Sequence, residues 1–461
     1  MMNAASPGSQ DRLDGLPVPA RYWAMAAIWL ALLMAVIDSS IANVALPTIA
    51  KDLHTAAAAS IWVVNAYQLA IVVSLLPLAA LGEIVTFRRI FLLGLLLFVL
   101  ASVGCCFAQS LPELALARAI QGFGAAGVMS VNPALVRFTY PSAQLGRAVG
   151  LNALVISVAS VIGPSLASLI LAHGSWPWLF AVNVPTGIAA LIVGSFALPL
   201  SPRSGGKLDR LSSILNVAAY GFTILGLDVL MRSGERVFGI ASIVTGIAAG
   251  WLLVRRSLPQ ERPLIPIDLL RNRLFTLTIA TSVASFTAQM LAFVSLPFFF
   301  QLVMHHTQVA TGLLMTAWPV AVGVAAPVAG RLADRYPAGL LGGFGLAMLA
   351  AGLFLLADLP VEAATATIVW RMALCGLGFG FFQAPNNRTL LSSAPRTRTG
   401  AAGGMLASAR LTGQTAGATL AAILFAMASS GLALSLWLGA AIAALGACVS
   451  LSRMALSPLP R

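Results

Sequence analysis

Two charged side chains stand inside long apolar stretches of the sequence, where an ionised group is costly to bury. Asp38 falls in the run 22–42, and Arg118 falls in the run 113–136. Desolvation favours the neutral form of a buried carboxylate, whereas a nearby guanidinium favours the ionised form. These opposed effects could make the protonation of Asp38 depend on its surroundings. The structural alternative is that Asp38 caps or pins its helix and that Arg118 ties two helices together.

Depth along the two helices favours a contact between these side chains. If both runs form helices that cross a membrane, Asp38 lies about 16 residues, or roughly 24 Å, from the cytoplasmic end of the first helix. Arg118 lies about 5 residues, or roughly 8 Å, from the outer end of the second helix. In an apolar core of about 30 Å, both fall in the outer third. We therefore predict that the pair takes part in proton coupling.

Other polar residues in or near the apolar runs are weaker candidates. The residues predicted for coupling or substrate binding are Asn43, Glu113, Asp228, Gln289 and Arg371. Glu113 and Asp228 each lie near the end of an apolar run, so their carboxylates could instead reach the interface between membrane and water. The same holds for the guanidinium of Arg410. Aromatic and amide side chains could line a cavity for flat cations, although lipid-facing or core positions are the alternative. These residues are Trp62, Tyr67, Gln68, Phe286, Gln289, Phe293, Trp318, Phe379 and Phe382.

The composition fixes the elements that must position these residues. The chain has 461 residues, of which 59% are apolar and 9% are charged, with a mean hydropathy of +0.93. Soluble domains are roughly 45 to 50% apolar and about 25% charged, so an ordinary soluble globule is excluded. The net charge of +13 comes in short clusters between apolar runs, which argues against a nucleic-acid-binding face. We predict an all-α polytopic membrane protein without nucleic acid as a partner.

Apolar runs bounded by polar or turn residues predict fourteen transmembrane helices. Six precede a central pair and six follow it: 22–42, 60–80, 90–108, 113–136, 149–172 and 178–198; 213–231 and 237–254; 275–303, 310–329, 339–357, 363–383, 401–427 and 431–451. The predicted organisation is a cytoplasmic tail (1–21), an N-terminal six-helix bundle (22–198), two inserted helices with a linker (199–274), a C-terminal six-helix bundle (275–451) and a second tail (452–461).

The distribution of basic residues predicts the orientation. Of the 27 Lys and Arg residues, 21 fall on the side that holds both termini, 3 on the other side and 3 within spans. Because cytoplasmic loops are enriched in Lys and Arg, both termini should be cytoplasmic. The linker segment PIDLLRNRL, residues 266–274, could form an interfacial helix.

An internal repeat relates the two bundles. Leu46-Pro47 recurs as Leu296-Pro297 at an offset of 250, Arg118 faces Arg371 at 253, and Gly163 faces Gly417 at 254. Two related six-helix bundles around a central site are typical of transporters that work by alternating access. The repeat therefore predicts two pseudo-symmetric halves that rock against each other.

Several motifs resemble those of the major facilitator superfamily. GRLADRYP, residues 330–337, resembles the G-x-L-a-D-r-x-G loop, which acts as a cytoplasmic latch in that family, and AALGEIVTFRR, residues 79–89, is a degraded first copy. In the first copy, Ala79 and Thr86 stand at the glycine positions. The resemblance implies the latch residues Glu83, Arg88, Arg89, Gly330, Arg331, Asp334 and Arg335, with Gly330 permitting close helix approach; an ordinary solvated turn is the alternative for each copy.

Four more segments resemble motifs of that superfamily: the first and fourth are similar to its fourteen-helix drug:proton antiporter branch, the second to a helix pattern of the family and the third to its antiporter motif. They are IDSSIANVALP (37–47), LALARAIQGFGAAG (114–127), VISVASVIGPSLASLIL (155–171) and SWPWLFAVNVPTG (175–187). In the third, Gly163-Pro164 is retained and predicts a bend in the helix, whereas Ala159, Ala167 and Ser168 occupy glycine positions. A plain packing kink is the alternative there.

This resemblance implies a proton-coupled exporter of amphipathic, cationic drugs in a bacterial inner membrane. Its expected partners are protons, a small-molecule substrate and the bilayer, and it is expected to be monomeric. No cofactor is expected, because the proton gradient supplies the energy and the sequence lacks the phosphate loop G-x-x-x-x-G-K-[ST]. The alternative on the same fold is export of a metabolite or organic anion, bound by buried arginines.

Two rivals from other classes fit the sequence less well. A membrane-embedded enzyme would need a nucleophile with a base, or a metal set, at membrane depth. The spans hold neither a histidine nor an acidic cluster. A channel is compatible with many helices, but a two-half repeat with a buried acid and base suits alternating access better. We therefore predict a transporter and not an enzyme.

Overall fold

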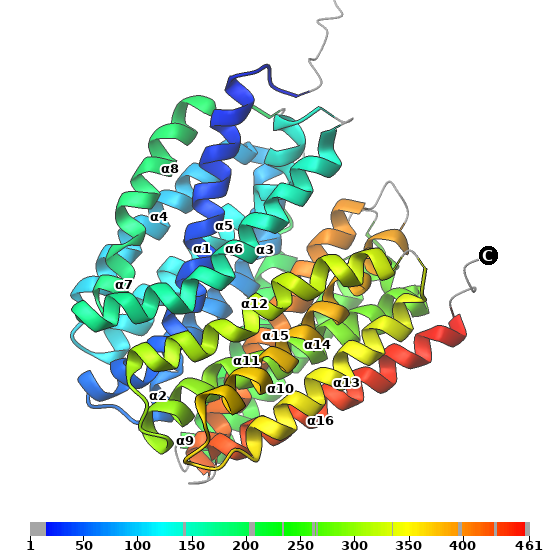
Figure 1. The fold of residues 1–461 in the computed structure, drawn as a ribbon. Helices are drawn as coiled ribbons and strands as arrows, with labels where there is room; N and C mark the ends of the chain where they lie inside the picture. Colours follow the sequence, from blue (N-terminus) through cyan, green and yellow to red (C-terminus); the bar gives the residue numbers. More distant parts are fainter. Residues whose placement is uncertain are drawn as a thin grey trace, which may run out of the picture.

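The computed structural model is built from long helices joined by short loops (Figure 1). It describes residues 15–141, 144–201, 208–232, 235–260, 263, 266–333, 335–394, 399–427 and 431–456. Within these residues every regular element is helical. This agrees with the all-α fold that the sequence predicts.

The N-terminal half comprises the helices up to residue 197. They are α1 (Ala20–Asp52), α2 (Ala57–Ser60), α3 (Trp62–Val85), α4 (Phe87–Phe107), α5 (Leu111–Thr139), α6 (Leu145–His173), α7 (Trp178–Ala181) and α8 (Asn183–Ala197). Helix α5 starts with a reciprocal cap: Ser110 accepts from the Glu113 amide, and Glu113 accepts from the Gln109 amide. Around α1, helices α5, α6 and α8 pack to form this half.

Two inserted helices and a short 3₁₀ turn lead to the C-terminal half. They are α9 (Arg210–Arg232), α10 (Arg236–Ser257) and Ile267–Arg271. Helix α9 lies against both halves: Asn216 Nδ2 donates to the Val73 carbonyl at 2.8 Å, and the Tyr220 and Thr412 hydroxyls are 2.9 Å apart. The predicted interfacial helix at 266–274 is limited to this 3₁₀ turn, because Asn272 caps the next helix through the amides of Leu274 and Phe275.

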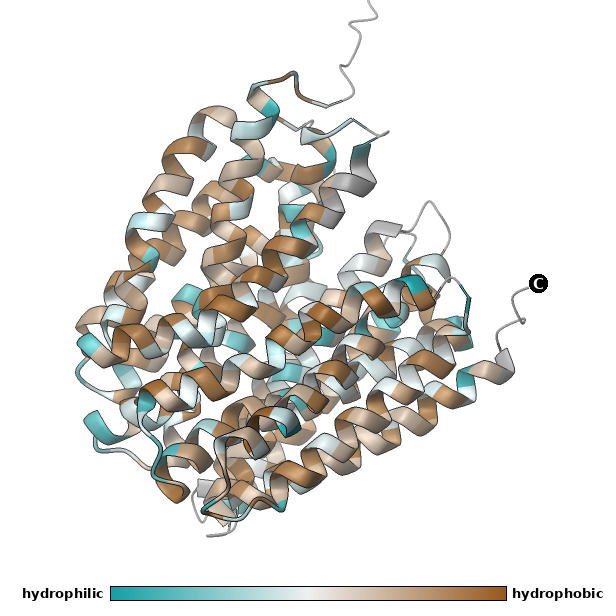
Figure 2. Ribbon diagram, viewed as in Figure 1, coloured by the Kyte–Doolittle hydropathy of each residue, from teal (hydrophilic) through white to brown (hydrophobic). Residues whose placement is uncertain are grey.

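The C-terminal half repeats the six-helix pattern. It comprises α11 (Arg273–Phe298) with a π-helical end (Phe299–Val303), α12 (Gln308–Leu332), α13 (Ala338–Ala357), α14 (Thr365–Ser392), α15 (Thr399–Met427) and α16 (Gly431–Ser452). Contacts between the halves join α6 to α12, α1 to α11 and α15 to α3. The two groups of helices are seen in Figure 1, and Figure 2 shows hydrophobic residues along their outer surfaces.

Thirteen helical segments of the described chain are long and apolar enough to cross a membrane. Helix α15 is the fourteenth predicted span and is absent from this set, because polar residues such as Arg410, Gln414 and Thr415 interrupt its apolar surface. Helices α1 and α14 run about ten residues beyond their predicted ends. The sequence pattern broke at polar residues, but Asn43 and Asn386 are buried inside the bundle and the helices continue past them.

Candidate functional site

Asp38 lies at the centre of a buried network in the N-terminal half. Its side chain is 1% exposed, and its Oδ2 accepts from Arg118 Nη1 at 2.6 Å in a buried ion pair. Its Oδ1 accepts from Gln121 Nε2 at 3.0 Å and from Asn183 Nδ2 at 2.7 Å. Three side chains thus donate hydrogen bonds to the two oxygens of the carboxylate. The structure therefore contains the contact between Asp38 and Arg118 that the sequence predicts.

Arg118 has contacts that do not depend on Asp38. They are the Val63 carbonyl at 3.0 Å, Gln121 Oε1 at 2.6 Å, and the rings of Tyr67 and Phe180 with centroids 4.1 and 5.4 Å from the guanidinium carbon. Carbonyl oxygens and aromatic faces both stabilise a cation in a low-dielectric site. Arg118 therefore has favourable partners besides Asp38.

Two members of this network were missed as site residues by the sequence analysis. Gln121 lies on α5 one turn after Arg118 and also donates to Ser102 on α4 at 2.8 Å, and Asn183 begins α8. The available signal was their place in the motifs LALARAIQGFGAAG and SWPWLFAVNVPTG, in which they are conspicuous polar residues. Through these contacts Asp38 joins helices α1, α3, α4, α5 and α8.

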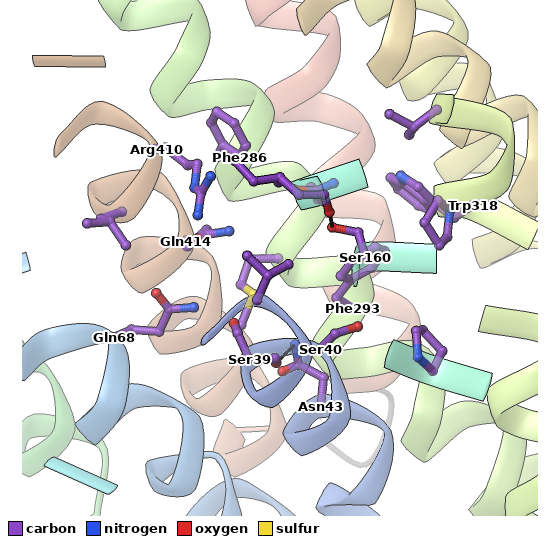
Figure 3. Close-up of a pocket in the computed structure, with 18 of the residues that line it drawn as sticks. Ser39, Ser40, Asn43, Gln68, Ser160, Phe286, Phe293, Trp318, Arg410 and Gln414 are labelled. Atoms are coloured by element: carbon purple, nitrogen blue, oxygen red, sulfur yellow. Dashed lines mark hydrogen bonds between the residues drawn. The ribbon is translucent and has the colours of Figure 1, made fainter. Parts of the chain in front are cut away.

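A cavity of about 170 Å³ lies between the two halves, adjacent to this network. Helix α1 carries Asp38 and, within its next two turns, the lining residues Ser39, Ser40 and Asn43 (Figure 3). Seven of the nine candidates for a cavity lining are present in it: Tyr67, Gln68, Phe286, Gln289, Phe293, Trp318 and Phe379. The other two are elsewhere, since Trp62 donates to Asp228 and Phe382 is buried in the C-terminal core.

Arg410 is the charged side chain among the described residues that line this cavity. The sequence analysis placed it nearer the cytoplasm, where it could reach the interface. The structure corrects that alternative, because Arg410 projects from α15 toward the cavity beside Gln414 (Figure 3). Within the described part of the chain it has neither a hydrogen bond nor an ion pair.

Three weaker candidates lie away from the cavity. Glu113 is exposed and caps the start of α5, and Asp228 on α9 accepts from Trp62 Nε1 at 2.8 Å. Arg371 donates to the Leu355 carbonyl and lies 5.5 Å from the ring of Trp370. Asn43 and Gln289 do line the cavity, and Asn43 Oδ1 is buried with no hydrogen-bond partner in the described protein.

The predicted latch residues are not joined to one another in this structure. Glu83, Arg89, Arg331 and Arg335 are exposed and belong to none of the ion pairs of the described residues, while Arg88 donates to the Ser195 carbonyl in its own half. Asp334 lies outside the described residues. A Cβ at Gly330 would meet nothing within 4 Å, so the close helix approach expected there is absent.

The first latch copy has a strained turn. Thr86, which stands at a glycine position of the motif, has a φ of 144°, which L residues rarely adopt. Its hydroxyl accepts from the Arg89 amide and caps α4. The cap gives a reason for threonine at this position, at the cost of an unfavourable backbone conformation.

Gly163 and Pro164 lie where α6 meets α1 and α12. A Cβ at Gly163 would come within 2.6 Å of the Ser40 Cβ, so glycine permits the close approach of α6 and α1. Pro164 lines the cavity, and its carbonyl faces Gly312 of the C-terminal half. The helix is continuous through both residues, from Leu145 to His173.

The chain belongs to the Major Facilitator Superfamily, which its sequence matches over residues 28–418. It is 49% identical over 440 residues to "Uncharacterized transporter YebQ" of Escherichia coli (strain K12), covering 95% of this chain and 96% of that protein. It is 28% identical to "Riboflavin transporter RibZ" of Clostridioides difficile (strain 630), with 83% of each chain covered. It is 30% identical to "Multidrug resistance protein Stp" of Mycobacterium tuberculosis (strain CDC 1551 / Oshkosh), covering 88% of this chain and 76% of that protein.

These matches establish the class of the protein. It is a multi-pass membrane transporter and not an enzyme. The superfamily that the loop and helix motifs predict is thereby confirmed.

Proposed function

We propose that this protein is a proton-coupled exporter that moves amphipathic aromatic compounds out of the cell by alternating access. The observation that carries the proposal is the ion pair of Asp38 and Arg118, buried next to a cavity between two halves of a transporter fold. A buried carboxylate that changes its protonation must change its partners as well. Such a change at α1 would alter the packing of the helices that the network joins.

The route from Asp38 to the seam between the halves runs along α1. Asp38 is followed by the cavity residues Ser39, Ser40 and Asn43, and the Val44 carbonyl accepts from Gln301 Nε2 of the other half at 3.4 Å. In the proposed cycle, protonation of Asp38 breaks its ion pair with Arg118, and Arg118 retains its contacts with the Val63 carbonyl and Gln121. A shift of α1 then acts on the cavity and on the seam together.

The conformation described here supports an opening toward the cytoplasm. Contacts between the halves include Ser165 with Thr316, 2.9 Å apart, in the parts of α6 and α12 that are predicted to lie toward the outer side. At the opposite face, the predicted latch residues that are described form no ion pair, and Arg88 donates to a carbonyl of its own half. We propose an inner-membrane location with both termini cytoplasmic, in line with the bias of basic residues toward that side.

The cargo is proposed to be aromatic and amphipathic. Phe286 and Phe379 pack edge to face at 5.3 Å in the cavity wall, as do Phe293 and Trp318 at 5.1 Å. Serine and amide side chains share the lining with them. The two relatives named for riboflavin and for multidrug resistance are consistent with such a cargo. The cationic charge expected from the sequence has less support, because the described lining contains no carboxylate.

The proposal is tested in proteoliposomes loaded with a pH-sensitive dye, with riboflavin as cargo. A pH gradient should drive cargo movement by the wild-type protein, and cargo should in turn drive proton movement. The variant Asp38→Asn should lose both effects but retain counterflow, the exchange of labelled for unlabelled cargo without a gradient, because the cavity is unchanged. Asp228→Asn is the matched control and should behave as the wild type.

The outcomes separate coupling from structure. Loss of counterflow as well as gradient-driven transport by a folded Asp38→Asn protein would assign Asp38 a structural role. Undiminished proton-driven transport in this variant would overturn the proposal, since another group would then carry the proton.

A further inference from the structure

We propose that the central cavity binds planar aromatic compounds that carry a negative charge, with Arg410 as the residue that recognises that charge. This inference rests on the proposed function for its physiological meaning. The binding site itself is defined by the lining residues alone, so binding can be measured without transport.

The electrostatics of the cavity point to an anion. Arg410 is the one charged side chain of the described lining, and it has no hydrogen-bond or ion-pair partner in the described chain. An unpaired charge between packed helices is costly, and such residues usually face a cavity that holds their partner. The acid that would favour a cation, Asp38, is instead 1% exposed and committed to Arg118. A bound anion would satisfy Arg410 by charge-assisted hydrogen bonds.

The repeat indicates that the shared fold does not require a charge at the position of Arg410. Gly163 and Gly417 make the same close approach, to α1 and α11 respectively, at an offset of 254. The same offset places Ile156 at the position equivalent to Arg410, and both residues line the cavity from opposite halves. The N-terminal half therefore packs this position with an apolar side chain. The charge at 410 is a special feature of the cavity.

Two buried polar atoms in the lining define further features of the ligand. Trp318 Nε1, a donor, and Asn43 Oδ1, an acceptor, have no hydrogen-bond partner in the described protein, although these residues are 0% and 4% exposed. A buried polar group without a partner costs free energy unless a ligand supplies one. The rings of Phe286 and Phe293 line the same cavity and offer aromatic surface to a planar ring system. The predicted ligand is thus an aromatic acid with a hydrogen-bonding edge.

The test compares three naphthalene probes of nearly the same shape: 2-naphthoate, 2-naphthamide and 2-naphthylmethylammonium. Binding to the full-length protein in nanodiscs is measured by calorimetry at neutral pH. The wild-type protein should bind the carboxylate most tightly and the ammonium probe most weakly. Arg410→Gln should weaken naphthoate binding about tenfold or more, as expected for the loss of a charge-assisted hydrogen bond of about 1.5 to 3 kcal/mol. It should change naphthamide binding less than twofold.

Matched variants distinguish charge recognition from a change of shape. Arg410→Lys keeps the charge and should retain part of the preference for naphthoate. Arg371→Gln removes an intramembrane arginine that does not line the cavity, and it should leave all three affinities unchanged. Equal losses for naphthoate and naphthamide in Arg410→Gln would overturn the inference, as would tighter binding of the ammonium probe to the wild type.

Failure here and failure of the proposed function are distinguishable. Naphthoate binding that depends on Arg410 can be present in a protein without proton coupling. Conversely, Asp38-dependent transport with equal affinity for the three probes would leave the proposed function standing and remove this inference.

Discussion

The two halves share one fold but differ at the position where the N-terminal half holds its buried ion pair. In the N-terminal half, Asp38 on α1 meets Arg118 on α5. The offset of 250 between α1 and α11 places Ala288 at the position of Asp38, and Ala288 is 0% exposed. The C-terminal half therefore has no carboxylate to receive an arginine at this place.

The glycine contacts correct the register of the second arginine. Gly122 approaches the carbonyl of Tyr67, and Gly376 approaches the carbonyl of Trp318 in the same way, so α5 and α14 correspond at an offset of 254. Arg118 then corresponds to Met372, which is 0% exposed, and not to Arg371. One residue rotates a side chain by about 100° around a helix. Arg371 thus faces away from the position that Arg118 occupies.

This difference suggests that the two halves have different roles. The N-terminal half has the acid and base pair, whereas the C-terminal half supplies Arg410 and most of the aromatic lining of the cavity. Proton coupling and cargo recognition would then reside on opposite sides of one cavity. Either half can be changed separately to test this arrangement.

The largest effect is expected from removing one partner of the buried pair. Arg118→Met leaves Asp38 buried beside two amides but without its cation, and breaking a buried pair in this way costs about 3 to 5 kcal/mol. Arg371→Met removes a contact to a carbonyl and to a partly exposed tryptophan, and should cost much less. Thermal unfolding of the two purified variants in the same detergent measures the difference.

A double variant gives the N-terminal half the two residues that the C-terminal half has at the equivalent positions. Asp38→Ala with Arg118→Met reproduces the Ala288 and Met372 arrangement, and it removes both charges together. It should therefore be more stable than Arg118→Met alone, although it cannot couple to protons. Similar unfolding temperatures for Arg118→Met and Arg371→Met would contradict the contrast between the halves.

A smaller effect is expected at the seam where the halves touch. A Cβ at Gly312 on α12 would lie 2.6 Å from the Pro164 carbonyl oxygen and would overlap Ser168 on α6. Gly312→Leu should therefore force the seam apart, at a cost of about 1 to 3 kcal/mol for overpacking. A cysteine introduced at Ser165, which contacts Thr316 across the seam, should react faster with a membrane-impermeant maleimide.

Gly323 provides the control on the same helix. A Cβ there would meet nothing within 4 Å, so Gly323→Leu should leave the labelling rate of the cysteine at 165 unchanged. An equal increase in the labelling rate in both variants would show that the effect does not come from steric overlap between α12 and α6 at the seam. The reaction of the native cysteines is subtracted with a protein that lacks the introduced cysteine.

Composition and periodicity were sufficient to predict the long helices, since lipid demands apolar stretches of known length. Depth along two helices was sufficient to pair Asp38 with Arg118. The position of Arg410 was not predictable in this way, because the direction of a side chain depends on the rotation and tilt of its helix. Nor could sequence offsets alone resolve Arg371 from Met372, since a single residue in a loop changes the register.

The smallest predicted effect concerns a carboxylate that, unlike Asp38, lies within reach of water. Asp209 precedes α9 and accepts from Ser212 and from Gln260, while Arg256 forms an ion pair with it at 3.2 Å. Desolvation alone would raise the pKa of Asp209, but these hydrogen bonds outweigh it and hold the pKa well below its usual range. The carboxylate therefore stabilises the fold above its unfolded pKa of about 4, and this contribution is lost as the pH falls below that value.

Asp209→Asn should accordingly lower the unfolding temperature slightly at pH 7, and the difference from the wild type should shrink as the pH falls below about 4. The side chains of Asp209 and Arg256 are 26% and 42% exposed, so solvent screening should limit the loss to about 1 kcal/mol or less. Thermal unfolding of the variant and the wild type at pH 7 and at a pH below about 4, repeated in high salt, measures this loss of stability. A loss as large as that of Arg118→Met would mean that burial is not what sets the ion pair of the N-terminal half apart.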